Sequence, residues 1–136
     1  MQGERPTQCR SNFKGHYLAT RSRPTVAKQF FSRTRATHFL LEYDTERAGD
    51  FKPLRFVEDK GVVLGLISSK VPALEPRETL ERRVREASQY LALEQLAISP
   101  QCGFASTVAG NPMTEADERA KLKLVTETAT AIWGRA

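Results

Sequence analysis

Two apolar stretches decide the fold of this chain: THFLLEY at residues 37–43 and VVLGLIS at residues 62–68. Both are short and rich in β-branched, aromatic and aliphatic residues, which favours strands over helices. Apolar residues occupy both alternating faces of each stretch. This pattern is typical of strands that are buried on both sides, in a helix-covered parallel sheet or in the wall of a barrel.

Helical patterns flank these strands. Residues 25–33, after Pro24, place Val26 and Phe30 on one helical face. Residues 77–91 form a longer amphipathic pattern, in which apolar residues recur at helical spacing: Leu80, Val84, Ala87 and Leu91. We expect a short helix in the first segment and a longer one in the second.

A third strand and a last helix follow. LAIS at residues 96–99 is a short apolar run that ends at Pro100. Thr114 is suited to begin a helix, with Asp117 as its partner in a capping box, and Gly134 is suited to end it. The buried stripe of this helix is predicted to comprise Leu122, Val125, Ala129, Ile132 and Trp133.

The order of these elements predicts the fold class. Strands alternate with helices, which is typical of an α/β fold with a parallel sheet and right-handed crossovers. A nucleotide-binding loop is not predicted, because the glycines near the strands fit neither GxGxxG nor GxxxxGKS/T. These glycines are Gly61, Gly65, Gly103 and Gly110.

Length and composition indicate one globular domain of ordinary type, with 136 residues, 40% hydrophobic and 27% charged. No apolar run approaches the roughly 20 residues that a membrane helix needs, and residues 1–35 lack the apolar core of a signal peptide. Two cysteines, Cys9 and Cys102, are too few for a disulfide framework. We therefore expect a cytoplasmic protein with reduced thiols and no membrane contact.

Positive charge is concentrated at the amino-terminal end. Residues 1–35 hold eight basic residues and one acid, a net charge of +7, whereas the other 101 residues hold 13 basic and 15 acidic residues, a net charge of −2. Three interpretations stay open: an organelle transit peptide, a basic arm that binds nucleic acid, and a solvated surface segment. The third is the simplest, and nucleic acid is not an expected partner.

Polar residues gather at the predicted carboxyl ends of the strands, where parallel α/β folds place their functional sites. Glu42 ends the first strand, and Cys102 follows the third. Together with Cys9, these residues could hold zinc through two sulfur atoms and one carboxylate. Each also has a structural interpretation, Glu42 as a salt-bridge partner and Cys102 as a small buried residue in a turn. The other polar or turn residues at these ends are Tyr43, Asp44, Ser68, Ser69, Lys70, Ser99, Pro100 and Gln101.

Neither histidine is expected to complete such a site. His38 precedes Glu42 by four residues, which is roughly 13 Å along a strand and too far for one metal ion. His38 is therefore interpreted as structural, and His16 has no assigned role.

Longer motifs carry a resemblance to a known family. Residues 62–134, which begin VVLGLISSKVPALEPRETLERRV and include SPQCGF at 99–104, resemble the carboxyl-terminal end of the cobalamin-independent methionine synthase family, particularly its shorter single-barrel branch. The resemblance continues upstream through FLLEYDTERAGDFKPLRF at residues 39–56 and CRSNF at residues 9–13. SPQCGF is the most specific of these motifs.

The resemblance implies zinc-dependent methyl transfer to a thiol, of the kind that methylates homocysteine from a methyl folate in methionine biosynthesis, without cobalamin. The zinc ligands of the family are a His-x-Cys pair, a glutamate and a second cysteine, and they correspond here to Cys9, Glu42 and Cys102. The histidine of the pair corresponds to Thr7, so one ligand is lost. No other catalytic or substrate-binding residue is assigned.

The family folds as a (β/α)8 TIM barrel, and the resemblance covers only its second half. We therefore expect residues 1–136 to form a single partial domain of about four βα units with parallel strands, with a leader unlike the family at residues 1–6. A half barrel leaves sheet edges uncovered, so self-association or a complementing half barrel is expected. Because the first half and one zinc ligand are missing, activity of the chain alone is not expected. The alternative is a non-catalytic remnant or interaction module.

Overall fold

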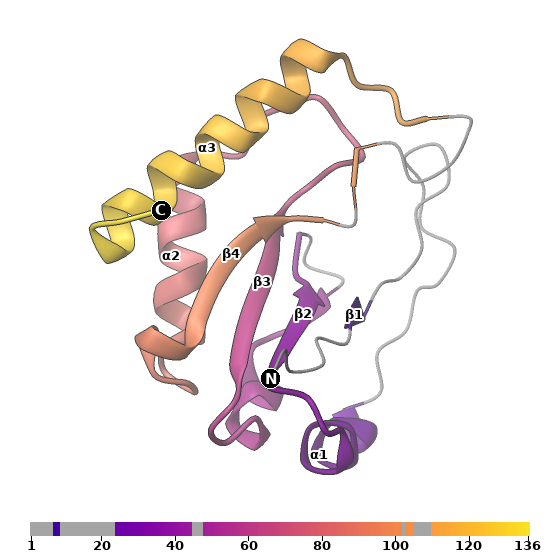
Figure 1. Ribbon diagram of the computed structural model, residues 1–136, viewed down its shortest axis with the longest axis vertical. Coiled ribbons are helices and arrows are strands. Elements are labelled where there is room, and N and C mark those ends of the chain that lie inside the picture. Colours follow the sequence, from indigo (N-terminus) through magenta and orange to yellow (C-terminus); the bar gives the residue numbers. More distant parts are fainter. Residues whose placement is uncertain (1–6, 9–23, 45–47, 102, 105–109) are drawn as a thin grey trace.

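The computed structural model describes residues 7–8, 24–44, 48–101, 103–104 and 110–136. Over these residues the chain forms an α/β fold built on a parallel sheet (Figure 1). The predicted α/β class with a parallel sheet is therefore confirmed, whereas the half barrel of about four βα units remains a prediction. The predicted leader at residues 1–6 and His16 lie outside the described residues.

The sheet has four strands in the order β1-β2-β3-β4, and each neighbouring pair is parallel. The register places Glu42 beside Gly65, and Gly65 beside Ser99. The carboxyl ends of the strands therefore lie at the same end of the sheet. The three strands predicted from the sequence are confirmed, whereas no sequence pattern indicated the two-residue strand β1. The bounds are β1 (Thr7–Gln8), β2 (His38–Glu42), β3 (Gly61–Ile67) and β4 (Leu96–Pro100).

The two central strands are buried, as their composition predicts. In β2, Phe39 and Leu41 are buried. In β3, burial is nearly continuous and includes Val62, Leu64, Leu66 and Ile67. At the start of β3, a Cβ atom on Gly61 would lie 2.3 Å from the ring of His38. His38 thus lies over the neighbouring strand, at the end of β2 opposite Glu42.

Helix α1 (Pro24–Arg33) precedes β2 and packs against it through aromatic rings. The ring centroids of Phe30 and Phe31 lie 5.3 Å and 4.9 Å from that of Phe39. Lys60 donates from its ammonium group to the carbonyl oxygens of Phe31, at 2.5 Å, and Thr34, at 3.1 Å. These bonds satisfy carbonyl groups that the end of a helix leaves without partners.

Helix α2 (Arg77–Ala87) lies between β3 and β4 in the chain and carries the predicted apolar face. Leu80, Val84 and Ala87 are buried. The helix ends at Ala87 rather than at Leu91 as the periodicity predicts, and residues 88–90 form a turn. Leu91 is still buried, so the apolar pattern marks the core correctly but extends beyond the helix.

The last helix, α3 (Glu115–Trp133), begins with the predicted capping box. The hydroxyl and backbone N–H groups of Thr114 donate to the carboxylate of Asp117 at 2.7 Å and 2.8 Å, and the Thr114 hydroxyl accepts from the Asp117 N–H. The two bonds from Thr114 to the carboxylate hold the pKa of Asp117 below its ordinary value. Gly134 ends the helix with a φ of 71°, which favours glycine.

The buried face of α3 differs from the predicted stripe. Leu122, which the prediction placed in the stripe, is 44% exposed, whereas Lys121 and Thr128 are completely buried. The ammonium group of Lys121 is satisfied by polar partners, so burial of this residue costs less than its charge suggests. The periodicity of apolar residues alone therefore misplaced the first turns of the face. Leu124, Val125, Ile132 and Trp133 are partly buried and pack against the core.

Helices α2 and α3 lie side by side next to β4, and α1 lies apart from them near the start of β2 (Figure 1). Short 3-10 helices occur at η2 (Lys52–Phe56) and at η3 (Leu93–Gln95). The indole N–H of Trp133 donates to the carbonyl oxygen of Leu93 at 3.1 Å and fixes the end of α3 near the start of β4. Within the described residues, no helix is long and apolar enough to cross a membrane.

Candidate functional site

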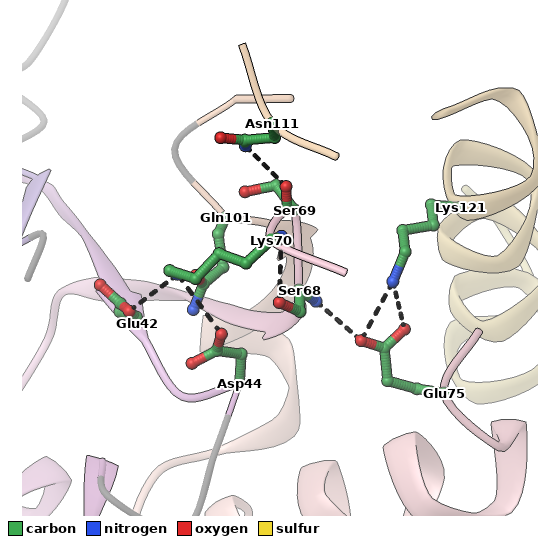
Figure 2. Close-up of polar contacts among 9 residues, drawn as sticks. All are labelled: Glu42, Asp44, Ser68, Ser69, Lys70, Glu75, Gln101, Asn111 and Lys121. Atoms are coloured by element: carbon green, nitrogen blue, oxygen red, sulfur yellow. Dashed lines mark hydrogen bonds and ion pairs between the residues drawn. The ribbon is translucent and has the colours of Figure 1, made fainter. Parts of the chain in front are cut away.

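A polar cluster joins the carboxyl ends of β2, β3 and β4, with Lys70 at its centre (Figure 2). The ammonium nitrogen of Lys70 lies 3.3 Å from a carboxylate oxygen of Glu42 and 3.5 Å from one of Asp44. It also donates to the side-chain oxygen of Gln101. Residues that follow three different strands therefore meet at one point. We call Glu42, Asp44, Lys70 and Gln101 the rim cluster.

The rim cluster is charged and buried. Side-chain exposure is 7% for Glu42, 1% for Asp44 and 3% for Lys70. Two carboxylates and one ammonium group give these three side chains a formal charge of −1. Buried charges are tolerated when they are paired and hydrogen-bonded, and each of these groups has such partners.

The turn after β3 directs Lys70 towards the carboxylates. The backbone N–H of Ser68 donates to a carboxylate oxygen of Glu75 at 2.8 Å, and the backbone N–H of Lys70 donates to the Ser68 hydroxyl at 3.2 Å. Asn111 donates from its side-chain amide to the carbonyl oxygen of Ser69 at 2.7 Å. Side chains thus fix the backbone of this turn at three successive residues, where regular strand pairing has ended.

Gly65 allows the strands to approach closely beside Glu42. A Cβ atom at this position would lie 3.1 Å from the backbone oxygen of Leu41 and 3.7 Å from the Cα atom of Glu42. A distance of 3.1 Å is tighter than most real Cβ contacts, so a larger residue here would push against the backbone of β2. Glycine at position 65 thus helps to determine where Glu42 lies.

Three buried polar atoms near the rim cluster have no hydrogen-bond partner among the described residues. They are the hydroxyl oxygen of Ser69, the side-chain nitrogen of Gln101 and the side-chain oxygen of Asn111. Gln101 and Asn111 are each held at the other end of the amide, by Lys70 and Ser69 respectively. An unsatisfied buried polar atom costs about 1–3 kcal/mol. These atoms present one fixed donor, one fixed acceptor and one hydroxyl group at the same rim.

The structure places one of the three predicted zinc ligands. Glu42 lies in the rim cluster, whereas Cys9 and Cys102 lie outside the described residues. Thr7, which corresponds to the lost histidine ligand, pairs with Leu40 at the edge of the sheet. Within the described ranges, no group of three His, Cys, Asp or Glu side chains is placed to hold a metal ion.

Sequence reasoning found the position of the rim cluster but not its contacts. Asp44, Lys70 and Gln101 were placed at strand ends without a role. Glu75 and Lys121, which support the turn after β3, were not singled out for the site. A lysine three residues after the end of an almost wholly apolar strand is a signal that could have identified Lys70, because functional groups of parallel α/β folds gather at the carboxyl ends of the strands.

Comparison with known proteins locates this chain within longer relatives. The chain is 44% identical over 127 residues to YxjG and to YxjH of Bacillus subtilis, both described as uncharacterized proteins. The match covers 92% of this chain and 34% of each relative. The chain thus spans about a third of the length of these relatives. No family model matches the chain.

Two further relatives carry a functional name. Methionine synthase of Pyrococcus abyssi is 30% identical over 75 residues, which are 55% of this chain and 22% of that protein. A solved structure from Listeria monocytogenes, described as a candidate vitamin-B12 independent methionine synthase, has a TM-score of 0.65 and 38% identity, covering 81% of this chain and 31% of that one. The chain is similar to methionine synthases. The similarity of the fold to about a third of the Listeria chain is consistent with a partial barrel.

Proposed function

We propose that this chain is the second half of a (β/α)8 barrel that performs zinc-dependent methyl transfer to a thiol in methionine biosynthesis. The similarity to methionine synthases supports the reaction class. The single structural observation that carries the site is the rim cluster, in which Lys70 contacts both Glu42 and Gln101. Gln101 directly precedes Cys102 in the sequence, which supports the proposal that the second cysteine belongs to the same site as Glu42.

The strand register supports the third ligand. Gln8 of β1 pairs with Leu41 of β2, and Cys9 and Glu42 are the residues that follow them in the sequence. Two thiolates and one carboxylate form a donor set that zinc accepts. We therefore assign Cys9, Glu42 and Cys102 as the residues that would hold zinc. Zinc held there would favour the thiolate form of a bound substrate thiol, whose proton passes to water, and would keep the sulfur in place as a nucleophile.

The described residues of the chain orient this site. Lys70 donates to one oxygen of Glu42 at 3.3 Å and so restricts the rotation of the carboxylate. Outer partners of this kind are a regular feature of metal sites, and their loss typically lowers metal affinity by about 10–100-fold. Burial of the cluster keeps water away from Glu42 and strengthens its contact with Lys70. Gly65 fixes the backbone on which Glu42 stands.

The proposed substrates and partners are those of a complete barrel rather than of this chain alone. By similarity, the acceptor is a homocysteine-like thiol and the donor is a methyl folate, with no role for cobalamin. The chain corresponds to about a third of its relatives, and in α/β barrels the loops of several strands together form the active site. We propose that a complementing half barrel or a second copy of the chain covers the open edge of the sheet.

A second candidate function is a non-catalytic remnant or interaction module. Two observations favour it. Thr7 replaces a histidine ligand, and a hydroxyl group is a poor ligand for zinc. In addition, Glu42 is already engaged by Lys70. A remnant would retain the fold and the rim cluster but would bind zinc no better than variants without the cysteines.

Zinc titration against a chromophoric chelator distinguishes the two functions. We expect tight binding by the wild-type chain and loss of most affinity in Cys102→Ser, because an alcohol replaces a thiolate. Thr7→His should raise affinity severalfold or more by restoring a fourth protein ligand. His38→Gln is the matched control, because His38 lies at the opposite end of β2. Equal weak binding by all four proteins would exclude the zinc site and favour the remnant.

A further inference from the structure

Lys121 is an unusual residue because its side chain is completely buried although it is charged. It belongs to the outer helix α3, yet its exposure is 0%. Its ammonium group donates to the carbonyl oxygen of Ala73 at 2.7 Å and forms an ion pair with Glu75 at 3.2 Å. Lysine is rarely buried in this way unless its partners require it. The helix therefore has a fixed polar attachment to the segment after β3.

Glu75 connects this attachment to the turn at the end of β3. Its carboxylate accepts from the Lys121 ammonium group and, at 2.8 Å, from the backbone N–H of Ser68. One carboxylate oxygen thus has partners on both α3 and the turn. Without Lys121, the side chain of Glu75, which is 19% exposed, can leave Ser68 for solvent.

Ser68 continues the connection to the rim cluster. Its hydroxyl group accepts from the backbone N–H of Lys70 at 3.2 Å, and the Lys70 ammonium group contacts Glu42. Figure 2 shows the complete series, with Lys121 extending from α3 towards Glu75 and Lys70 extending the other way towards Glu42. A continuous set of polar contacts therefore joins an outer helix to the predicted zinc ligand.

We propose that Lys121 is a positioning residue for the site: acting through Glu75 and the turn at Ser68, it holds Lys70 against Glu42. The part of this inference that concerns metal affinity rests on the proposed zinc site, and the part that concerns the turn does not. Lys123 provides a matched comparison. It lies on the same helix and pairs with Glu127 at 3.6 Å, but its side chain is 74% exposed.

Amide hydrogen exchange of the metal-free protein tests the turn. Lys121→Met should increase the exchange rates of the Ser68 and Lys70 amides by about tenfold or more relative to amides in α2, because the acceptor of Ser68 is released. Lys123→Met should leave both rates unchanged. If Lys121→Met does not fold, Glu75→Gln tests the same contact, because it removes the ion pair while retaining an oxygen acceptor, and a smaller increase is expected. Unchanged rates at Ser68 and Lys70 in a folded variant would overturn the proposal.

Measurements of zinc affinity distinguish a positioning role of Lys121 from a general effect on folding stability. Lys121→Met should weaken zinc binding by on the order of tenfold, and Lys121→Arg, which keeps the charge, should restore most of it. In a Lys70→Met background, Lys121→Met should have no further effect on zinc affinity, because the contact through which it acts is gone, although its cost in folding stability should persist. Additive losses of affinity would mean that Lys121 does not act through Lys70. If the wild-type chain binds no zinc, the proposed function fails and the exchange experiment alone decides the role of Lys121.

Discussion

Replacement of Lys70 by methionine tests whether the rim cluster holds the carboxyl ends of the strands together. Methionine retains much of the length and apolar volume of lysine but removes the ammonium group. Glu42 and Asp44 would then remain buried and lose this shared cation. We expect the variant to lose a large part of the free energy of unfolding, because buried charges that lose a partner are costly.

The magnitude follows from the distances. At an effective dielectric constant of about 20, opposite unit charges attract by about 5 kcal/mol at the 3.3 Å of Glu42 and by nearly as much at the 3.5 Å of Asp44. Desolvation of the ammonium group, several kcal/mol, opposes this attraction. Removal of one partner of a buried ion pair typically lowers the free energy of unfolding by about 3–5 kcal/mol. We expect Lys70→Met to fall within that interval.

Urea denaturation, followed by the fluorescence of Trp133, measures the loss. Trp133 is the single tryptophan of the chain and packs against the core. Lys52→Met is the control, because Lys52 pairs with Asp50 at the same 3.3 Å but with side chains 63% and 58% exposed. It should cost less than about 1 kcal/mol. If Lys70→Met also costs less than about 1 kcal/mol, the rim cluster does not contribute to stability and the electrostatic argument is wrong.

Four further predictions concern the helices and the sheet. Thr114→Ala should cost about 1 kcal/mol by removing the helix cap, measured by the same denaturation. Because folding lowers the pKa of Asp117, its stabilising effect is present above the ordinary value of 3.8 and is lost as the pH falls further. Wild type and Asp117→Asn should therefore differ in stability at about pH 6, and the difference should shrink as the pH falls below 3.8. Gly65→Val should destabilise by about 1–3 kcal/mol through overpacking and should shift the amide resonance of Glu42, whereas an unchanged spectrum would show that β2 tolerates the side chain. Leu80→Ala in the buried face of α2 should cost about 2–5 kcal/mol, and a smaller loss would mean that the neighbouring helix closes the space.

Much of the fold could be predicted because its signals are local. The composition of the two apolar stretches predicted the central strands, and the spacing of Thr114 and Asp117 predicted the cap of α3. Parallel strands also bring their carboxyl ends together, so the location of a polar site near Glu42 followed from topology alone. What could not be predicted is the pairing of side chains across the sheet, because Lys70 contacts residues 26 and 28 positions away.

Lys121, the buried lysine of α3, shows why the buried face of this helix was predicted incorrectly. Helical periodicity locates a buried face by its apolar residues, so a cation on that face is assigned to solvent and the stripe is displaced towards Leu122. Burial of Lys121 depends on acceptors 46 and 48 residues away, at Glu75 and Ala73. The strand β1 was missed for a similar reason, since two residues have no periodicity and are held by pairing with β2. The predicted ligands Cys9 and Cys102 lie outside the described residues and remain predictions.

The two polar attachments of α3 have a consequence for how the protein opens. Lys121 is tied to the segment after β3, and Trp133 is tied to Leu93 just before β4. The attachments are 12 residues apart, about 18 Å along the helix axis. A helix held at two separate points can release one end while the other stays docked, at a free energy below that of global unfolding. Release of the Lys121 end would therefore loosen the segment after β3 while the Trp133 end stays attached beside β4.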